Sequence, residues 1–478
     1  MGLSKPPSVP GQEGISEVRL LHGGSRVDAS FDEPNLVSAA GLVPVMRLAA
    51  AAGLGRLVSD RLRVGGPCGA NAAGKVAAIV AGMVAGADCI DDLDVVRSGG
   101  LRRLFGCVYA PSTLGSFLRA LTWGHVRQLE SASRAFLAGM ARLTPLLPGA
   151  DQVAYVDVDS LLRRVYGHGK AGAALGYAKV GGYGVLLRGL SPLIATVCTP
   201  LAAPVVAASR LRGGNAGSAR GAAGLVAEAV GVARAAGATG LVLVRADSAY
   251  CSAAVLGACR RAAACFSVTV RLDRTVRAAV ASIPATGWTP IRYSQAVWDD
   301  DGQCWISAAE VAETTHTLHA GSRRALTCRL VVRRIRAASR PGETELFPAW
   351  RYHAFLTDTR LSTVDADRTH RAHAVIEQTF ADLIDGPIAH LPSGRFAANA
   401  AWLTCAGIAH NLLRATGTLA GGHHAKARGA TVRRQLVTIP ARTAHRSRKI
   451  TLRLPAHWPW ADAWTALFTA THAPPAAA

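Results

Sequence analysis

The stretch Tyr155-Val156-Asp157-Val158-Asp159-Ser160 decides how the rest of the sequence is interpreted, because an apolar run of β type stops here at two carboxylates. Side chains on a strand alternate between its faces, so Asp157 and Asp159 leave the same face and repel each other. The only other acid in the segment 152–246 is Glu228. A divalent cation would explain a close pair in so acid-poor a segment. The alternative is that both aspartates merely solvate a strand end.

The size and charge of the chain limit the classes of protein to which it can belong. With 478 residues it is too long for one ordinary hydrophobic core, so we expect two or three domains. The formal net charge is +22 and the pI is about 10.4, which makes a polyanion, above all nucleic acid, the expected partner. Nearly all of the positive charge is arginine, whose guanidinium group suits bidentate contacts with phosphate.

Cysteines and apolar segments bear on the compartment. The ten cysteines are scattered without a C-x-x-C pair, which favours reduced, buried thiols over zinc ligands or disulfides. No apolar run is long enough to cross a bilayer, and the N-terminus lacks the apolar core of a signal peptide. We therefore expect a cytoplasmic protein without a membrane partner.

The N-terminal third is predicted to be helical. Residues 1–30 carry prolines and glycines with little periodicity and are expected to be loose, apart from a short strand at Val18–Leu21. Over residues 31–150 apolar residues recur every three to four positions, which predicts an all-α domain. We assign this domain to DNA binding; an ordinary bundle with a solvated basic face is an equally supported alternative.

Short β runs separated by glycines follow and predict an α/β domain over residues 151–272, completed by residues 358–415. The run Leu241–Ala246 ends at Asp247, much as the first stretch ends at Asp159. Strands that alternate with helices form a sheet covered by helices, and functional groups collect at the C-terminal ends of such strands. Asp159 and Asp247 are therefore expected to approach each other.

A glycine-rich loop, Leu211–Ser218, leads into a helical run expected at Ala219–Ala236. The loop lacks both the G-K-S/T ending of a phosphate loop and the G-x-G-x-x-G spacing of a dinucleotide site. We interpret it as a turn in which Ser218 caps the helix.

Residues 273–357 lose the alternation of strands and helices and are predicted to form a β-rich insertion. Trp298 adjoins the acidic turn Asp299-Asp300-Asp301. We expect at least one of Trp288, Trp298 and Trp305 to be partly exposed beside the acidic site, with Trp298 favoured by that turn. An exposed indole there can stack on an unpaired base. A purely structural role in a small sheet is the alternative for any one tryptophan here.

A further acid lies on a helix predicted from Asp365 to Ile384. On that helix Glu377 shares one face with His370, His373 and apolar residues. An acid on such a face costs free energy unless it is paired or bound to a metal ion.

Residues 416–478 are predicted to form a basic C-terminal region. From Arg414 to Arg453 there are ten Lys or Arg and no acid, which indicates a phosphate-binding surface. The cations there that we expect to contact DNA are Arg433, Arg434, Arg446, Arg448 and Lys449.

Taken together, these features resemble the DDE transposases of bacterial insertion sequences. The acids lie at the ends of two strands and on a helix beyond a β-rich insertion, and RLRGGNAGSARGA and VRADSAY look like stretches of the subgroup with such an insertion. The resemblance implies an α/β fold with an RNase H-like mixed sheet flanked by helices. It also implies that Asp159, Asp247 and Glu377 hold two Mg²⁺ ions, for which Mn²⁺ can substitute. Asp157 is the alternative to Asp159.

The helix departs from the signature of that subgroup, which is Tyr-x-x-Arg-x-x-x-Glu with a Lys seven residues after the Glu. Here His370, His373 and Ile384 stand at the Tyr, Arg and Lys positions, and Glu377 matches. The resemblance then implies that His370 and His373 lie at the DNA, with Arg371 taking part of the role of holding phosphates.

The function implied by the resemblance is that of a transposase that binds the terminal inverted repeats of its element, cleaves DNA and joins the 3′ ends to target DNA. It implies a homodimer on double-stranded DNA in the bacterial cytoplasm, at the nucleoid. Three carboxylates and DNA supply enough ligands for two ions roughly 4 Å apart. The alternative is a non-catalytic, decayed or repurposed sequence-specific DNA-binding protein. A plain nuclease is a third hypothesis, in which the helical region and basic tail would be superfluous.

Overall fold

The structure is a computed structural model that describes residues 28–106, 108–167, 169–180, 183–293, 296–306, 309–336 and 350–473. The chain divides into two units, Met1–Pro34 and Asn35–Ala478. Of the first unit only residues 28–34 are described, and they contain neither helix nor strand. The strand expected at Val18–Leu21 lies outside the described residues. All features below belong to the second unit.

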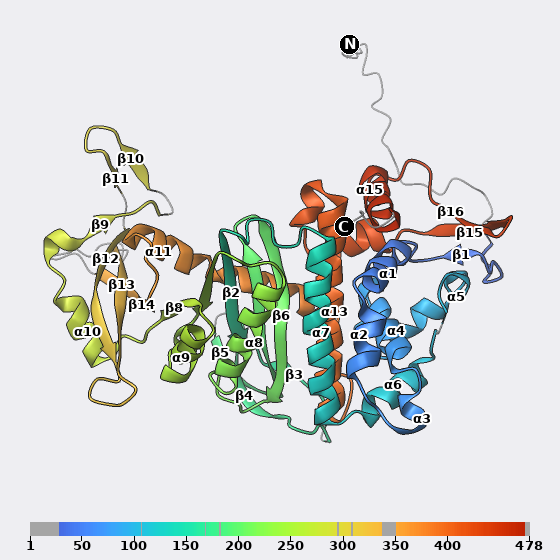
Figure 1. The fold of residues 1–478 in the computed structure, drawn as a ribbon, viewed down its shortest axis with the longest axis horizontal. Coiled ribbons are helices and arrows are strands. Elements are labelled where there is room, and N and C mark those ends of the chain that lie inside the picture. Colours follow the sequence, from blue (N-terminus) through green and yellow to red (C-terminus); the bar gives the residue numbers. More distant parts are fainter. Residues whose placement is uncertain are drawn as a thin grey trace, which may run out of the picture. The chain divides into compact units, whose positions relative to one another are not determined.

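The second unit begins with a helical region, drawn blue to cyan in Figure 1. Its longer helices are amphipathic or almost wholly apolar, and their apolar faces form one core with the rest of the unit. The longest, α7, starts at Thr122, whose side chain caps the helix in a reciprocal box with His125. The helices are α1 (Leu42–Ala51), α2 (Leu54–Arg61), α3 (Gly66–Gly69), α4 (Ala72–Ala85), η1 (Asp91–Arg97), α5 (Leu101–Leu104), α6 (Pro111–Ala120) and α7 (Trp123–Leu143).

A large mixed sheet forms the centre of the unit. The parallel strands are β2 (Val153–Ser160), β7 (Leu241–Ala246) and β8 (Cys265–Thr269), and on the other side of β2 the antiparallel strands β5 (Tyr183–Thr199) and β6 (Ala202–Gly213) follow. The short strands β3 (Arg163–Arg164) and β4 (Ala174–Val180) also pair with β5. This order, β6-β5-β2-β7-β8, is that of an RNase H-like sheet and confirms the predicted α/β fold class.

Helices cover both faces of the sheet (Figure 1). One face carries α8 (Ala222–Ala235), which packs on β5, β6 and β2, with α9 (Ala253–Arg261) beside it. The other carries α11 (Thr363–Arg371), η4 (Ala372–Val375) and α12 (Ile376–Ile384). The long α13 (Phe396–Ala420) runs along the outer edge of β6, where Asn411 bonds to the backbone of Val206, and also packs against α7. The helices α7 and α13 therefore join the helical region to the sheet.

The β-rich insertion begins with α10 (Arg274–Ala281) and η3 (Ala285–Gly287) and continues the same sheet. Strand β14 (Trp350–Thr357) pairs antiparallel with β8, and β13 (Leu326–Arg336), β12 (Ala309–Leu318) and β9 (Thr289–Pro290) follow in order. Within the described residues, β10 (Val297–Asp299) and β11 (Cys304–Ile306) form a separate two-stranded hairpin.

The C-terminal region returns to the start of the unit. After η5 (Gly422–Ala425), α14 (Gly429–Val432) and the π-helical turn η6 (Arg433–Val437), strand β15 (Ala441–Arg446) pairs with β1 (Leu36–Val37) and with β16 (Lys449–Arg453). The last helix is α15 (Ala461–His472), which contacts α1 and α13.

Two sequence-based expectations need correction. The helix expected from Asp365 to Ile384 is interrupted by the 3₁₀ turn η4, which changes the direction in which the following side chains point. The helix α8 starts at Ala222, and Gly221, with φ +80°, occupies the N-cap position instead of Ser218. Glycine adopts that left-handed conformation without the steric cost that a side chain adds.

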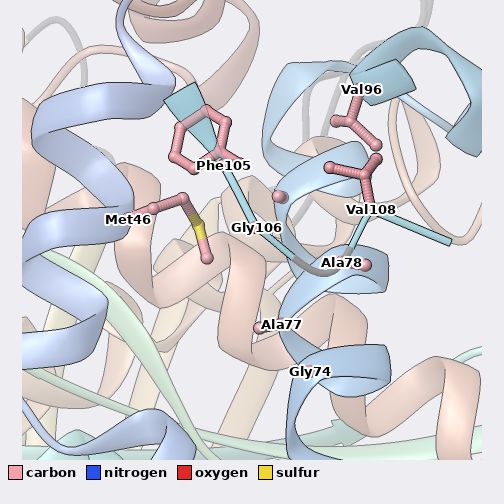
Figure 2. A pocket seen from close by; sticks show the side chains of 9 residues that line it. Met46, Gly74, Ala77, Ala78, Val96, Phe105, Gly106 and Val108 are labelled. Atoms are coloured by element: carbon pink, nitrogen blue, oxygen red, sulfur yellow. The ribbon is translucent and has the colours of Figure 1, made fainter. Parts of the chain in front are cut away.

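An apolar pocket of about 100 Å³ lies within the helical region, between α1, α4 and the segment around Val108 (Figure 2). Its lining, which includes Met46, Val96 and Phe105, contains no charged side chain. No single helix in the described ranges is long and apolar enough to cross a membrane, and the bent pair α1 and α2 meets that test only when both helices are counted together.

Candidate active site

Asp159 and Asp247 lie at the carboxyl ends of neighbouring parallel strands. In the register of β2 and β7, Val158 pairs with Ala246, so the next residue of each chain segment is an aspartate. Asp159 is partly buried and Asp247 is exposed. The expectation that the two acids approach each other at one edge of the sheet agrees with this register.

The environment of Asp159 disfavours its charged form. Desolvation, with the nearby charge of Asp247 adding to it, raises the pKa of Asp159 to about 6. The amide of Ser160 donates to Asp159 Oδ1 over 2.6 Å, and the hydroxyl of the fully buried Tyr250 lies 3.4 Å from the same oxygen. Neither acid forms an ion pair with a described cation of the chain; the Asp247 carboxylate accepts the amide of Ala249. Two neighbouring carboxylates without a cationic partner are suitable ligands for a divalent cation.

Asp157, in contrast, is fully buried and paired with Arg245 on β7. The guanidinium donates to both carboxylate oxygens over 2.7 Å, and its third arm donates to the carbonyl oxygen of Thr369 at the end of α11. His373 Nδ1 lies 2.9 Å from Asp157 Oδ1. Burial alone would raise the pKa of Asp157, but Arg245 and His373 hold it below its usual value. Asp157 and Arg245 therefore connect the sheet with α11 and η4, the segment that precedes Glu377.

Glu377 lies in the first turn of α12, which packs against β2 and β6. Its side chain is exposed and makes no ion pair with any described residue. The carboxyl oxygens of Asp159, Asp247 and Glu377 are not all within 4.8 Å of one another. The helix that carries the third acid thus reaches the strand that carries the first, but the three acids do not form a tight cluster.

The histidines expected at the DNA point into the protein. The ring nitrogens of His370 lie 2.8 Å from Ser267 Oγ and 3.0 Å from Thr269 Oγ1, and the ring stacks on Phe355. Desolvation, followed by the charge of His373, lowers the pKa of His370 to about 3. A neutral ring with both nitrogens occupied is a poor partner for a phosphate.

Arg371 and Trp298, also expected at the DNA, lie at the insertion. Arg371 donates to Asp367 over 2.8 Å and is about one third exposed. Trp298 is 41% exposed and meets Trp305 edge to face across the β10–β11 hairpin, with ring centroids 5.1 Å apart. Figure 1 shows this hairpin above β9 and β12, at the top of the insertion.

The basic C-terminal region divides into structural and exposed cations. Arg433 is partly buried and donates to the carbonyl of Val84, and burial lowers its pKa. Arg434 is exposed on the same turn. Arg446, Arg448 and Lys449 are exposed at the tip of the β15–β16 hairpin, which we call the basic hairpin.

A second group of potential metal ligands occurs in the helical region. Ligand atoms of Asp88, Cys89 and Asp92 lie within 4.8 Å of one another, and among the described residues no other such trio occurs. The Asp92 carboxylate accepts the amide of Asp88, and Asp88 contacts His390 at 3.2 Å. Because these residues bond to the loop backbone and to a neighbouring side chain, we interpret the group as a cluster that stabilises the loop.

Sequence reasoning missed Arg245 and Tyr250 as parts of the site. Arg245 lies two positions before Asp247, on the strand face that carries the acids, as Asp157 lies two positions before Asp159. That spacing is the signal that could have indicated a buried pair. Tyr250 follows Asp247 in a 3₁₀ turn and reaches back to Ser160 Oγ over 3.0 Å.

Comparison with known proteins agrees with the geometry. No curated protein matches the chain. The model of the family described as Transposase DDE domain group 1 matches residues 20–473, nearly the whole chain. Members of that family act on DNA and generally use divalent metal ions. The chain therefore belongs to the DDE-domain transposases of group 1.

Proposed function

We propose that this transposase binds the terminal inverted repeats of an insertion sequence, cleaves DNA phosphodiesters with two divalent ions and joins the 3′ ends to target DNA. The observation that carries the proposal is the pair Asp159 and Asp247 at adjacent strand ends, with the pKa of Asp159 raised to about 6 and no described cation of the chain paired with either acid. Such a pair is suited to Mg²⁺ or Mn²⁺.

Asp159, Asp247 and Glu377 are the residues that we propose as ligands. Two divalent ions, when bound, would activate the attacking hydroxyl group and stabilise the leaving oxygen. Glu377 completes the set once α12 brings its carboxylate toward β2, against which that helix packs. We assign Asp157 a positioning role, because its bonds to Arg245 and His373 hold the segment before Glu377.

The remaining residues have supporting roles in this proposal. Tyr250 restrains Asp159 and Ser160 at the end of β2, which limits the directions that the Asp159 carboxylate can take. The basic hairpin and Arg434 would hold DNA phosphates, and a homodimer would bring two element ends together. We leave His370 out of the DNA interface because its ring nitrogens already bond to strand β8.

A cleavage assay tests the proposal. The substrate is duplex DNA carrying the repeats that flank the gene, incubated with the full chain in Mg²⁺ or in EDTA. We expect strand cleavage and end joining in Mg²⁺ only, with losses on the order of 10³-fold or more in Asp159→Asn, Asp247→Asn and Glu377→Gln. Full activity of any one of these variants would remove that residue from the site.

A non-catalytic DNA-binding protein is the second candidate. It is favoured by His370 and His373, which stand at the Tyr and Arg positions of the subgroup signature and bond to the interior of the protein. In that case the wild-type chain would bind the repeats but would leave them intact with Mg²⁺ and with Mn²⁺.

A further inference from the structure

A cavity of about 360 Å³ lies where the helical region meets the central sheet, and none of the proposed metal ligands lines it. Trp123 and Phe396, the first residues of α7 and α13, line it together with the end of β6 and with Gly221 before α8. Its volume is typical of sites that bind a small molecule or a single nucleotide.

One wall of the cavity is aromatic. Trp123 is 44% exposed, and the centroids of the Trp123 and Phe396 rings are 6.1 Å apart. The Phe396 ring is fixed from behind by the backbone of Gly172, where an added Cβ would lie 2.6 Å from the ring. The Trp123 indole N–H has no hydrogen-bond partner in the described part of the chain. An exposed indole beside a fixed ring is a stacking surface for a planar ligand.

The polar wall favours an anion. Arg220 is exposed and forms no ion pair with the described residues, whereas Arg210 is neutralised by Glu228 and Glu130. No acid lines the cavity. The helices α8 and α13 both begin here without a side-chain cap, so their partial positive ends add to the charge of Arg220.

A second cavity lies between the Trp123 cavity and the segment that carries Asp159. The loop Gly213–Ser218 separates the Trp123 cavity from this second cavity of about 430 Å³, which is lined by Ser160, Tyr177 and Leu186, and Ala216 lines both. Ser160 follows Asp159 directly. The loop itself is held in shape by the buried Arg212, which donates to the carbonyls of Gly217, Ser218 and Arg220. The loop is therefore a wall common to both cavities, and the second one reaches Ser160 beside Asp159.

We propose that the Trp123 cavity binds one unpaired nucleotide of the DNA strand that passes the active site. The base stacks on Trp123, and its phosphate lies at Arg220 and the starts of α8 and α13. A cavity of this size holds one nucleotide and excludes a duplex. The proposal rests on the proposed function for the identity of the strand, and its chemistry is distinct from the metal-dependent step.

Binding in EDTA tests the proposal without any cleavage. The probe is a short single-stranded oligonucleotide in which 2-aminopurine replaces adenine, because stacking on an indole quenches its fluorescence. We expect quenching with the wild-type chain and loss of that quenching in Trp123→Ala, with affinity lower by roughly 5- to 150-fold. Trp123→Phe, which keeps an aromatic ring but has no indole, should recover the affinity and not the quenching. Arg220→Ala should weaken binding, whereas the matched variant Arg261→Ala, an exposed arginine at the end of α9, should not.

The arms of this experiment separate the possible failures. Unchanged quenching and affinity in both Trp123→Ala and Arg220→Ala would overturn the proposal. Because Arg220 is exposed, we expect its variant to fold even if Trp123→Ala does not. Free dAMP that binds as tightly as the oligonucleotide would also overturn it, because the cavity would then be a small-molecule site. A wild-type chain that binds and quenches but never cleaves DNA in Mg²⁺ would count against the proposed function alone.

Discussion

At the scale of single residues, Arg245 has the greatest expected effect on stability. Its charge and that of Asp157 are both withdrawn from water, so removal of either leaves the other uncompensated. We expect Arg245→Met to lower the free energy of unfolding by about 3–5 kcal/mol, measured by urea denaturation followed by circular dichroism. Arg261→Met, at an exposed arginine, should cost less than about 0.5 kcal/mol. Equal effects of the two variants would mean that the buried pair of Asp157 and Arg245 does not contribute to the free energy of unfolding.

His370 makes a testable contribution to acid sensitivity. The pKa of His370 is about 3 in the folded chain against an ordinary value of 6.5. Between pH 3 and pH 6.5, therefore, His370 binds a proton in the unfolded chain but not in the folded one. The stability that it contributes is complete above pH 6.5 and is lost as the pH falls toward 3, by at most about 1.4 kcal/mol per pH unit. In His370→Gln the unfolding free energy should fall less steeply from pH 7 to pH 4 than in wild type. The exposed His445→Gln should keep the wild-type slope, and identical slopes in all three chains would contradict the buried, neutral His370.

The residues of the site were predictable only in part. The alternation of side chains on a strand placed Asp157 and Asp159 on one face, but their opposite environments arise from a partner strand. Asp157 lies opposite Arg245 only because β2 and β7 pair in one particular register, which no local pattern encodes. The acid at a strand end and the acid one pleat inside it look alike in the sequence.

At the scale of elements, the interrupted helix before Glu377 is informative. A continuous helix would place His370, His373 and Glu377 on one face, but η4 interrupts it where His373 bonds to Asp157. The histidines then point toward the sheet while Glu377 stays exposed. Helical periodicity could not predict this break, because its cause is a tertiary contact with a residue 216 positions away.

The basic hairpin carries the prediction about DNA affinity. Its turn residues Ser447 and Arg448 both have positive φ, which matches the two-residue turn between twisted strands and holds the Arg448 side chain at the tip. We expect Arg448→Gln with Lys449→Gln to reduce the slope of log affinity against log salt by up to about 2, measured by fluorescence anisotropy from low to moderate salt. The control pair Arg323→Gln and Arg324→Gln, exposed at the β12–β13 turn, should leave the slope unchanged. A larger effect of the control pair would mean that the insertion, and not the basic hairpin, contacts the DNA phosphates.

At the scale of the whole molecule, long-range pairing explains what the sequence could not predict. The order of helices and strands indicated an α/β domain with an insertion, and the sheet agrees with it. The continuation of that sheet from β8 into β14 depends on antiparallel pairing between Val268 and Leu356. The pairing of Leu36 with Arg442, near opposite ends of the chain, also has no local signal.

The most direct test of the central claim is the affinity for Mn²⁺, measured by calorimetric titration of the full chain at pH 8, where Asp159 is ionised. We predict that Asp159→Asn, Asp247→Asn and Glu377→Gln each weaken Mn²⁺ binding by roughly 10- to 100-fold or more, while Asp92→Asn, in the other acidic group, leaves it at the wild-type value. Wild-type affinity in all three active-site variants, or loss of Mn²⁺ binding in Asp92→Asn alone, would contradict it.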